Sequence, residues 1–117
     1  MKRVTPHLRE LLAETVTPLA VYQRLKALSP VRFLFESVTG GEQVARFSFL
    51  GAAPREIYRL YPDRLEVERD GRRSDLPGPP LAALRAVVEG YSTPELPVPF
   101  AGGFVGTFGF DLVRLVE

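Results

Sequence analysis

Residues 31–51, VRFLFESVTGGEQVARFSFLG, decide how this chain folds. The segment reads as two short strands, rich in Val, Phe and Ser, on either side of a glycine pair. Polar side chains interrupt both strands, because Glu36 and Ser37 stand where an apolar run should continue and Arg46 is the only charge in the second. A carboxylate binds an ammonium, a guanidinium binds a carboxylate, and a hydroxyl serves either group. Residue types alone favour a surface ion pair across the strands, and the functional alternative is a clamp for a small zwitterion.

Strand alternation limits how such a clamp can be built. Successive residues point to opposite faces, so Glu36 and Ser37 cannot both face one ligand from a regular strand. Either the backbone bends there, or the ligand lies against the strand end and uses main-chain groups. A two-residue turn would pair Ala45 with Glu36, whereas a three-residue loop over 40–42 would pair Arg46 with Glu36. We expect the second, because three-residue loops with a left-handed glycine are common hairpin connections.

Composition narrows the class of protein. The 117 residues are 45% hydrophobic and 25% charged, which fits one soluble globular domain or part of one. The formal net charge of +1 indicates no nucleic-acid partner. The absence of cysteine excludes thiolate catalysis, and the single histidine, His7, is expected at the surface. We find no catalytic constellation, no metal cluster, no membrane-spanning run and no signal-peptide core, so we expect a cytoplasmic protein.

Apolar spacing and turn residues predict an α+β fold with a largely antiparallel β-sheet and flanking helices. The predicted helices cover residues 6–14, 17–27, 80–88 and 110–117. The predicted strands cover residues 31–38, 45–51, 56–61, 64–68, 72–76 and 100–108. Asp70-Gly71 predicts a tight hairpin, and Gly90 is placed to end a helix. The chain stops inside the last predicted helix, so we expect the front part of a longer protein.

Three segments of the chain resemble the N-terminal region of anthranilate synthase component I, a chorismate-utilising enzyme family. The first is similar to a Thr-Pro-Val-x-Val-Tyr helix followed by a Leu-Leu-Glu-Ser-like strand, the second to Gly-Arg-Tyr-Ser-Phe-Ile-Gly, and the third to Pro-Phe-x-Gly-Gly-x-x-Gly. In this chain they read TPLAVYQRLKALSPVRFLFES (17–37), GGEQVARFSFLGAAP (40–54) and PVPFAGGFVGTFGFDLVRLVE (97–117).

The resemblance implies a regulatory site for L-tryptophan as feedback inhibitor. In the family, the Leu-x-Glu-Ser strand and a basic residue on the next strand form part of that pocket. The matching positions here are Leu34, Glu36, Ser37 and Arg46, with Glu36 expected to meet the ammonium of the amino acid. The chain departs from the family at Phe35, where leucine is usual.

The resemblance also implies that residues 1–117 are the N-terminal regulatory region and that the C-terminal chorismate-binding domain is absent. The parent would be a lyase that makes anthranilate from chorismate, with ammonia from a glutamine amidotransferase subunit, component II. Its catalytic residues and Mg2+ belong to the C-terminal domain, so we expect this part alone to be inactive. Two alternatives stay open, the N-terminal part of aminodeoxychorismate synthase component I and a stand-alone amino-acid-binding module.

Overall fold

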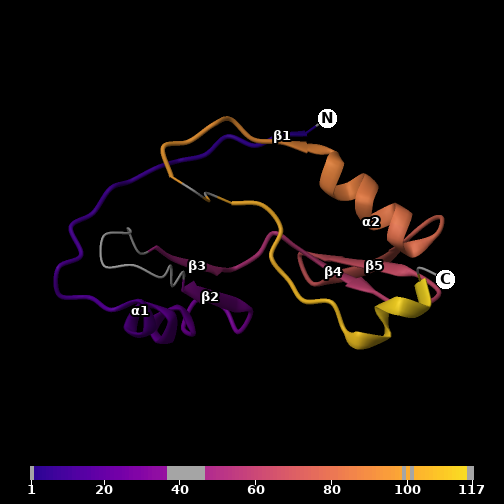
Figure 1. Cartoon of the computed structure of the whole chain (residues 1–117), viewed down its shortest axis with the longest axis horizontal. Coiled ribbons are helices and arrows are strands. Elements are labelled where there is room, and N and C mark those ends of the chain that lie inside the picture. Colours follow the sequence, from indigo (N-terminus) through magenta and orange to yellow (C-terminus); the bar gives the residue numbers. More distant parts are fainter. Residues whose placement is uncertain (1, 37–46, 99, 101, 116–117) are drawn as a thin grey trace. The chain divides into compact units, whose positions relative to one another are not determined.

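The computed structural model describes residues 2–36, 47–98, 100 and 102–115 (Figure 1). The chain forms two compact units. Residues 9–54 form one, called here the hairpin unit, and residues 1–8 with 55–117 form the other, called here the sheet unit. The sheet unit is therefore built from two stretches of chain that the hairpin unit separates in the sequence.

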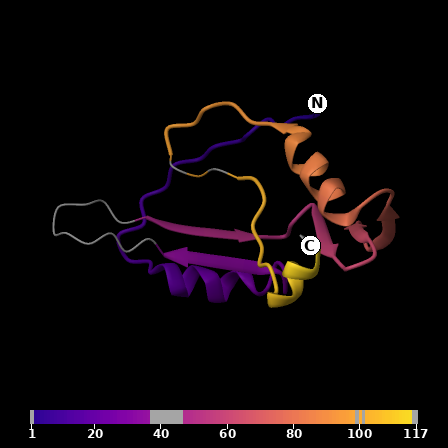
Figure 2. The same ribbon diagram turned by 45° about the vertical axis from the view of Figure 1, so that its right-hand side comes forward.

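The hairpin unit consists of one helix and two antiparallel strands. Helix α1 covers Pro18–Leu25, β2 covers Arg32–Glu36 and β3 covers Ser48–Ala52. The strands lie side by side, with α1 running along them (Figure 2). Thr17 caps the helix, since its hydroxyl accepts a hydrogen bond from the Ala20 amide at 3.2 Å. The expected helix over 17–27 is confirmed in shortened form, and both expected strands are confirmed within the described residues.

Phe33 and Gly51 face each other directly across the hairpin. A Cβ atom on Gly51 would lie only 2.2 Å from Cε1 of the Phe33 ring, so the ring occupies the space that a side chain would need. A glycine in a strand often marks such a close approach, and an aromatic ring on the neighbouring strand covers the exposed backbone. This contact favours the observed alignment of the two strands.

The sheet unit is built on a three-stranded antiparallel sheet. Its strands are β4 (Glu56–Leu60), β5 (Leu65–Arg69) and β6 (Arg72–Leu76), paired in that order. Helix α2, Pro80–Glu89, contacts β4 and β5. Leu65 in the central strand is fully buried between its cross-strand partners on β4 and β6, both of which are leucines. The sheet unit thus has a small apolar centre on β5.

The turn between β5 and β6 fits the prediction from Asp70-Gly71. Both residues have positive φ angles, 53° at Asp70 and 75° at Gly71. Two successive left-handed residues match the twist of the flanking strands, and Asp-Gly tolerates that conformation well. The expected helix over 80–88 is also confirmed as α2, whose C-cap is Gly90.

Charged side chains occupy the second face of this sheet. The Arg59 guanidinium lies 2.7 Å from a Glu68 carboxylate oxygen and 3.3 Å from Glu66, and it holds the pKa of Glu68 below its ordinary value. Arg73 stands opposite Glu68 on β6. Arginine and carboxylate side chains therefore line this face, while the leucines of the three strands share the other.

A second, two-stranded pairing joins the two stretches of the sheet unit. Strand β1, Lys2–Arg3, runs parallel to β7, Tyr91–Ser92. The amide of Lys2 donates to the Gly90 carbonyl at 2.8 Å, and the amide of Val4 donates to the Ser92 carbonyl at 2.9 Å. The N-terminal residues are thus fixed beside the end of α2.

Two elements expected from the sequence do not form. Residues 6–14 contain no helix, and Leu8, Leu11 and Leu12 are 63%, 74% and 85% exposed. A helix this short is marginal in water unless a packed face supports it, and here the leucines bury little. The described part of 100–108 contains no strand, because Gly102 and Gly103 adopt φ angles of 141° and 134°, outside the strand region.

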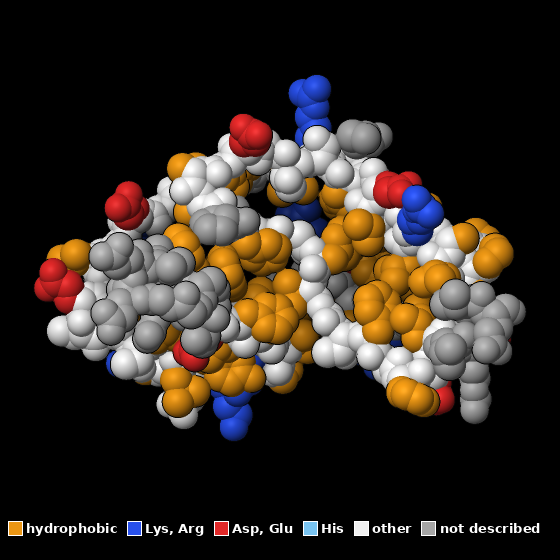
Figure 3. All heavy atoms as spheres, viewed as in Figure 1, with side chains coloured by type: hydrophobic (Ala, Val, Ile, Leu, Met, Phe, Trp, Pro, Cys, Tyr) orange, Lys and Arg blue, Asp and Glu red, His pale blue; other side chains and the backbone are white. Residues whose placement is uncertain are grey.

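The C-terminal helix forms as a tighter turn than expected. Residues Phe110–Leu115 adopt a 3₁₀-helix, η1. Hydrophobic side chains are widespread at the surface (Figure 3), and Phe110 is 95% exposed. Among the described residues, no helix has the length and apolar character needed to cross a membrane. Helices and small antiparallel sheets together make this an α+β fold.

The close approach of Phe33 to Gly51 generates a stability prediction. Gly51→Ala adds a methyl group where the ring already lies, and we expect it to lower the free energy of unfolding by about 1–3 kcal/mol. Chemical denaturation of the full chain measures this change. In a Phe33→Leu background the same substitution should cost less, because the ring that it meets is gone.

Gly106→Ala is the matched control. A Cβ atom there would meet nothing within 4 Å, so we expect a change within about 0.5 kcal/mol. Equal effects of the two substitutions would show that loss of glycine, rather than contact with Phe33, controls the result.

Candidate functional site

Two of the four predicted site residues lie on the described part of β2. The ladder pairs Leu34 with Leu50 and Glu36 with Ser48, so these four side chains share one face of the hairpin. Leu34 is half-buried, whereas Glu36 and Ser48 are exposed at the end of the paired segment. The arrangement places a carboxylate and a hydroxyl next to an apolar pair.

Helix α1 lies on the side of the hairpin that carries this face. Arg32, which shares the face of Leu34, donates from Nε to the Tyr22 carbonyl at 3.1 Å. Its guanidinium also lies 4.5 Å from the centre of the Tyr22 ring, within range of a cation–π interaction. Because Tyr22 belongs to α1, these contacts fix the start of β2 against the helix. The guanidinium of Arg32 is thus engaged by Tyr22, and Glu36 is the exposed charged residue of β2.

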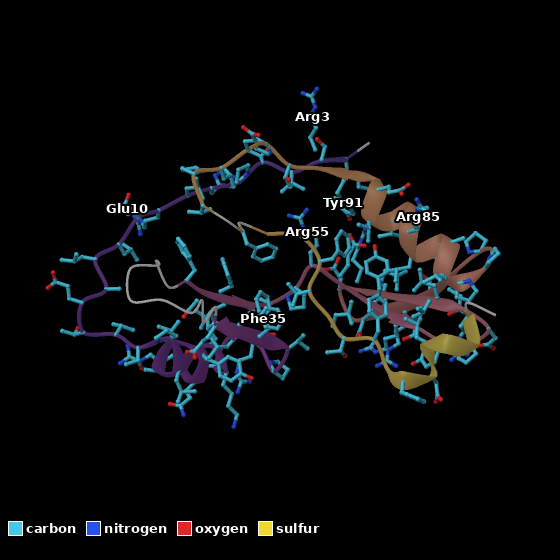
Figure 4. All side chains as sticks on the ribbon, viewed as in Figure 1. Arg3, Glu10, Phe35, Arg55, Arg85 and Tyr91 are labelled. Atoms are coloured by element: carbon cyan, nitrogen blue, oxygen red, sulfur yellow. The ribbon has the colours of Figure 1, made fainter. Side chains whose placement is uncertain are left out.

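Aromatic rings occupy the opposite face. Phe33 and Phe35 lie 5.4 Å apart on β2, and the rings of Phe47 and Phe49 stack at 6.4 Å. Phe35, labelled in Figure 4, is 51% exposed, and Phe47 is 43% exposed. The two faces of the hairpin therefore differ in chemistry, one aromatic and the other polar at its end.

The register of the hairpin corrects one expectation. A three-residue loop would have paired Arg46 with Glu36, but the partner of Glu36 is Ser48. The shift of two residues keeps the alternation of faces and places Phe33 on Gly51. Ser37 and Arg46 themselves lie outside the described residues, so the choice between a bent strand and a ligand at the strand end stays open.

Sequence reasoning overlooked Ser48 as a neighbour of Glu36. The residue lies in the same RFSFLG run as Arg46, and only the strand alignment distinguishes the two as partners. Within the described residues, no group of three or more His, Cys, Asp or Glu side chains is gathered in a way that could hold a metal ion.

Comparison with known proteins finds relatives that share one name. The chain is 41% identical over 113 residues to anthranilate synthase component 1 of Pseudomonas aeruginosa, covering 92% of this chain and 23% of that protein. The chain is homologous to part of anthranilate synthase component 1. This confirms the resemblance drawn from the three sequence segments.

Other relatives of the same name match the chain equally broadly. The protein of Thermus thermophilus is 38% identical over 122 residues, covering 100% of this chain and 25% of that protein. That of Acetivibrio thermocellus is 35% identical over 118 residues, covering 97% and 24%. The chain spans about a quarter of the length of the curated relatives that it matches. No family model and no solved structure matches it.

The observed register can be tested by cross-linking, because the chain contains no cysteine. Glu36→Cys with Ser48→Cys places two thiols on directly paired residues, whose Cα atoms lie about 4.5–5.5 Å apart in such pairs. This separation suits a disulfide, so we expect rapid cross-linking under mild oxidation, measured by mass spectrometry of the digested chain.

Phe35→Cys with Ser48→Cys is the matched control, since these side chains point to opposite faces and should cross-link poorly. Faster cross-linking between cysteines at positions 36 and 46 than between 36 and 48 would contradict the register.

Proposed function

We propose that this chain is the N-terminal, regulatory part of anthranilate synthase component I, an enzyme of tryptophan biosynthesis. One observation supports this above all, the identity of 35%, 38% and 41% to proteins of that name along nearly the whole chain. The parent enzyme converts chorismate to anthranilate, as a lyase that uses glutamine or ammonia as the nitrogen source. The name component 1 supports a second subunit, which we propose to be the glutamine amidotransferase.

Catalysis belongs, in this proposal, to a C-terminal chorismate-binding domain of the same protein. That domain would hold Mg2+ and the catalytic residues, and it would act in the cytoplasm together with component II. Residues 1–117 contribute no catalytic side chain. Their role is regulatory, and it consists in binding the end product of the pathway.

Leu34, Glu36, Ser37 and Arg46 form part of the proposed site for L-tryptophan. The exposed carboxylate of Glu36, at the end of the paired strands, is suited to the ligand ammonium. Leu34 supplies apolar surface on the same face, and Arg46 supplies the guanidinium for the ligand carboxylate. Ser37 then fixes the orientation of the ligand through its hydroxyl.

The proposed activity predicts that the complete protein and the 117-residue chain differ in anthranilate formation. The complete protein, supplied with chorismate, ammonia and Mg2+, should form anthranilate, which is followed by its fluorescence. The chain of 117 residues should form none, because the proposed chorismate site lies in the C-terminal domain. Formation of aminodeoxychorismate instead would identify the folate-pathway enzyme, and anthranilate formation by the chain alone would refute the assignment of catalysis.

Feedback inhibition gives a sharper test of the site. In the complete protein, Ser37→Phe should abolish inhibition by L-tryptophan while leaving uninhibited turnover unchanged, because the ring fills the proposed pocket. Glu36→Gln should raise the inhibitory tryptophan concentration by about tenfold to a hundredfold, the range expected for losing a hydrogen bond to a charged group. Both effects are measured as inhibition curves at fixed chorismate.

Matched controls use the same substitutions at exposed positions outside the proposed site. Ser74→Phe changes an exposed serine on β6, and Glu10→Gln changes an exposed glutamate of the hairpin unit. Neither should alter the inhibition curve. Undiminished inhibition in Ser37→Phe would refute the site while leaving the enzymatic assignment intact.

A further inference from the structure

A buried carboxylate in the sheet unit gathers three hydrogen-bond donors from separate places in the chain. Glu56 begins β4, and its side chain is only 7% exposed. It accepts hydrogen bonds from the hydroxyl of Tyr58 and, at 2.8 Å, from that of Tyr91. Arg69, its direct partner on β5, forms an ion pair with it at 2.7 Å. The acid is therefore fully engaged, and none of the four residues belongs to the proposed tryptophan site.

The two tyrosines extend this cluster to both ends of the chain. The ring of Phe104 lies 6.1 Å from that of Tyr58 and 5.5 Å from that of Tyr91. The Lys2 ammonium lies 5.4 Å from the centre of the Tyr91 ring, and the Lys2 backbone pairs with Tyr91 in the β1–β7 ladder. Tyr91 is labelled in Figure 4, where it follows α2. The Glu56 carboxylate thus orients the two tyrosine rings, and these rings contact Lys2 of β1 and the ring of Phe104.

We propose that Glu56 is a buried anionic joint that fastens the N-terminal strand β1 and the segment 102–109 to the three-stranded sheet. When its charge is removed, both segments are released together, while β4, β5 and β6 stay paired. The sheet has its own ladder and its own apolar centre at Leu65, which do not require the tyrosine hydroxyls. Strand β1 has only two residues and depends on Tyr91 and Ser92 for its pairing.

Acid should mimic removal of the charge. Burial by itself raises the pKa of Glu56, but the hydrogen bonds from Tyr58, Tyr91 and Arg69 outweigh it and hold the pKa below the ordinary value of 4.5. The stabilisation is therefore complete above pH 4.5 and is lost as the pH falls through the lowered pKa. The charged groups of the cluster besides Glu56 are Arg69 and, through the Tyr91 ring, Lys2.

Hydrogen exchange of the full chain tests the joint. In Glu56→Gln at neutral pH, the amide of Val4 should exchange about tenfold faster, while the amides of β5 change by less than about twofold. Release of 102–109 should appear as loss of the nuclear Overhauser contacts between the Phe104 ring and the rings of Tyr58 and Tyr91. Tyr91→Phe keeps the ring and removes only the hydroxyl, so it should release β1 with less risk to folding. Combining the two variants should add little, because both break the same joint.

Glu66→Gln is the matched control, since Glu66 is also a partly buried glutamate of this sheet but lies on the opposite face, beside Arg59. It should leave the Val4 amide protected and the Phe104 ring contacts intact. On acidification, the protection of Val4 relative to β5 should fall in the wild type and stay constant in Glu56→Gln. Uniform acceleration across the sheet unit, or unchanged protection of Val4 in both Glu56→Gln and Tyr91→Phe, would overturn the proposal.

Discussion

The contact between the Phe33 ring and Gly51 is the constraint on which the geometry of the candidate site depends. The ring fills the space above the glycine, so a shift of one residue would place it against Leu50 or Ala52 and turn every side chain to the other face. With the strands held in this register, Leu34 and Glu36 share a face with Leu50 and Ser48. The composition of the site therefore follows from an aromatic–glycine contact on the opposite side of the hairpin.

The sequence predicts those elements whose signals are local. Thr17 caps α1 through its own hydroxyl, and Asp70-Gly71 adopts the left-handed pair that a tight hairpin needs. The two failures have a common cause. Helical spacing over 6–14 and apolar character over 100–108 describe a face suited to burial, but neither pattern says what covers that face. Where little packs against that face, the conformational entropy of the chain outweighs the gain from burial, and the segment stays irregular.

Part of the candidate site can likewise be predicted from individual residues, while the rest depends on how the strands pack. The polar interruption at Glu36 is visible in the sequence, and so is the resemblance of the chain to anthranilate synthase component 1. Its neighbour Ser48 is not, because loop length sets the register and several lengths are compatible with two glycines. The Glu56 cluster is still harder to foresee, since Tyr91 lies 35 residues further along the chain. Buried polar networks depend on contacts between distant segments, and no local sequence pattern predicts them.

The division of the chain into two units explains why such a cluster is useful. Residues 9–54 form the hairpin unit and separate β1 from the rest of the sheet unit. Closing a loop of this length costs about 3 kcal/mol of chain entropy. The β1–β7 ladder is only two residues long, so its backbone hydrogen bonds, at about 1 kcal/mol each, leave little margin over that cost. Side chains add to this pairing, because Tyr91, which donates a hydrogen bond to Glu56, also lies against the Lys2 ammonium. A carboxylate that costs free energy to bury thus lies at the place where the two stretches of a discontinuous unit meet.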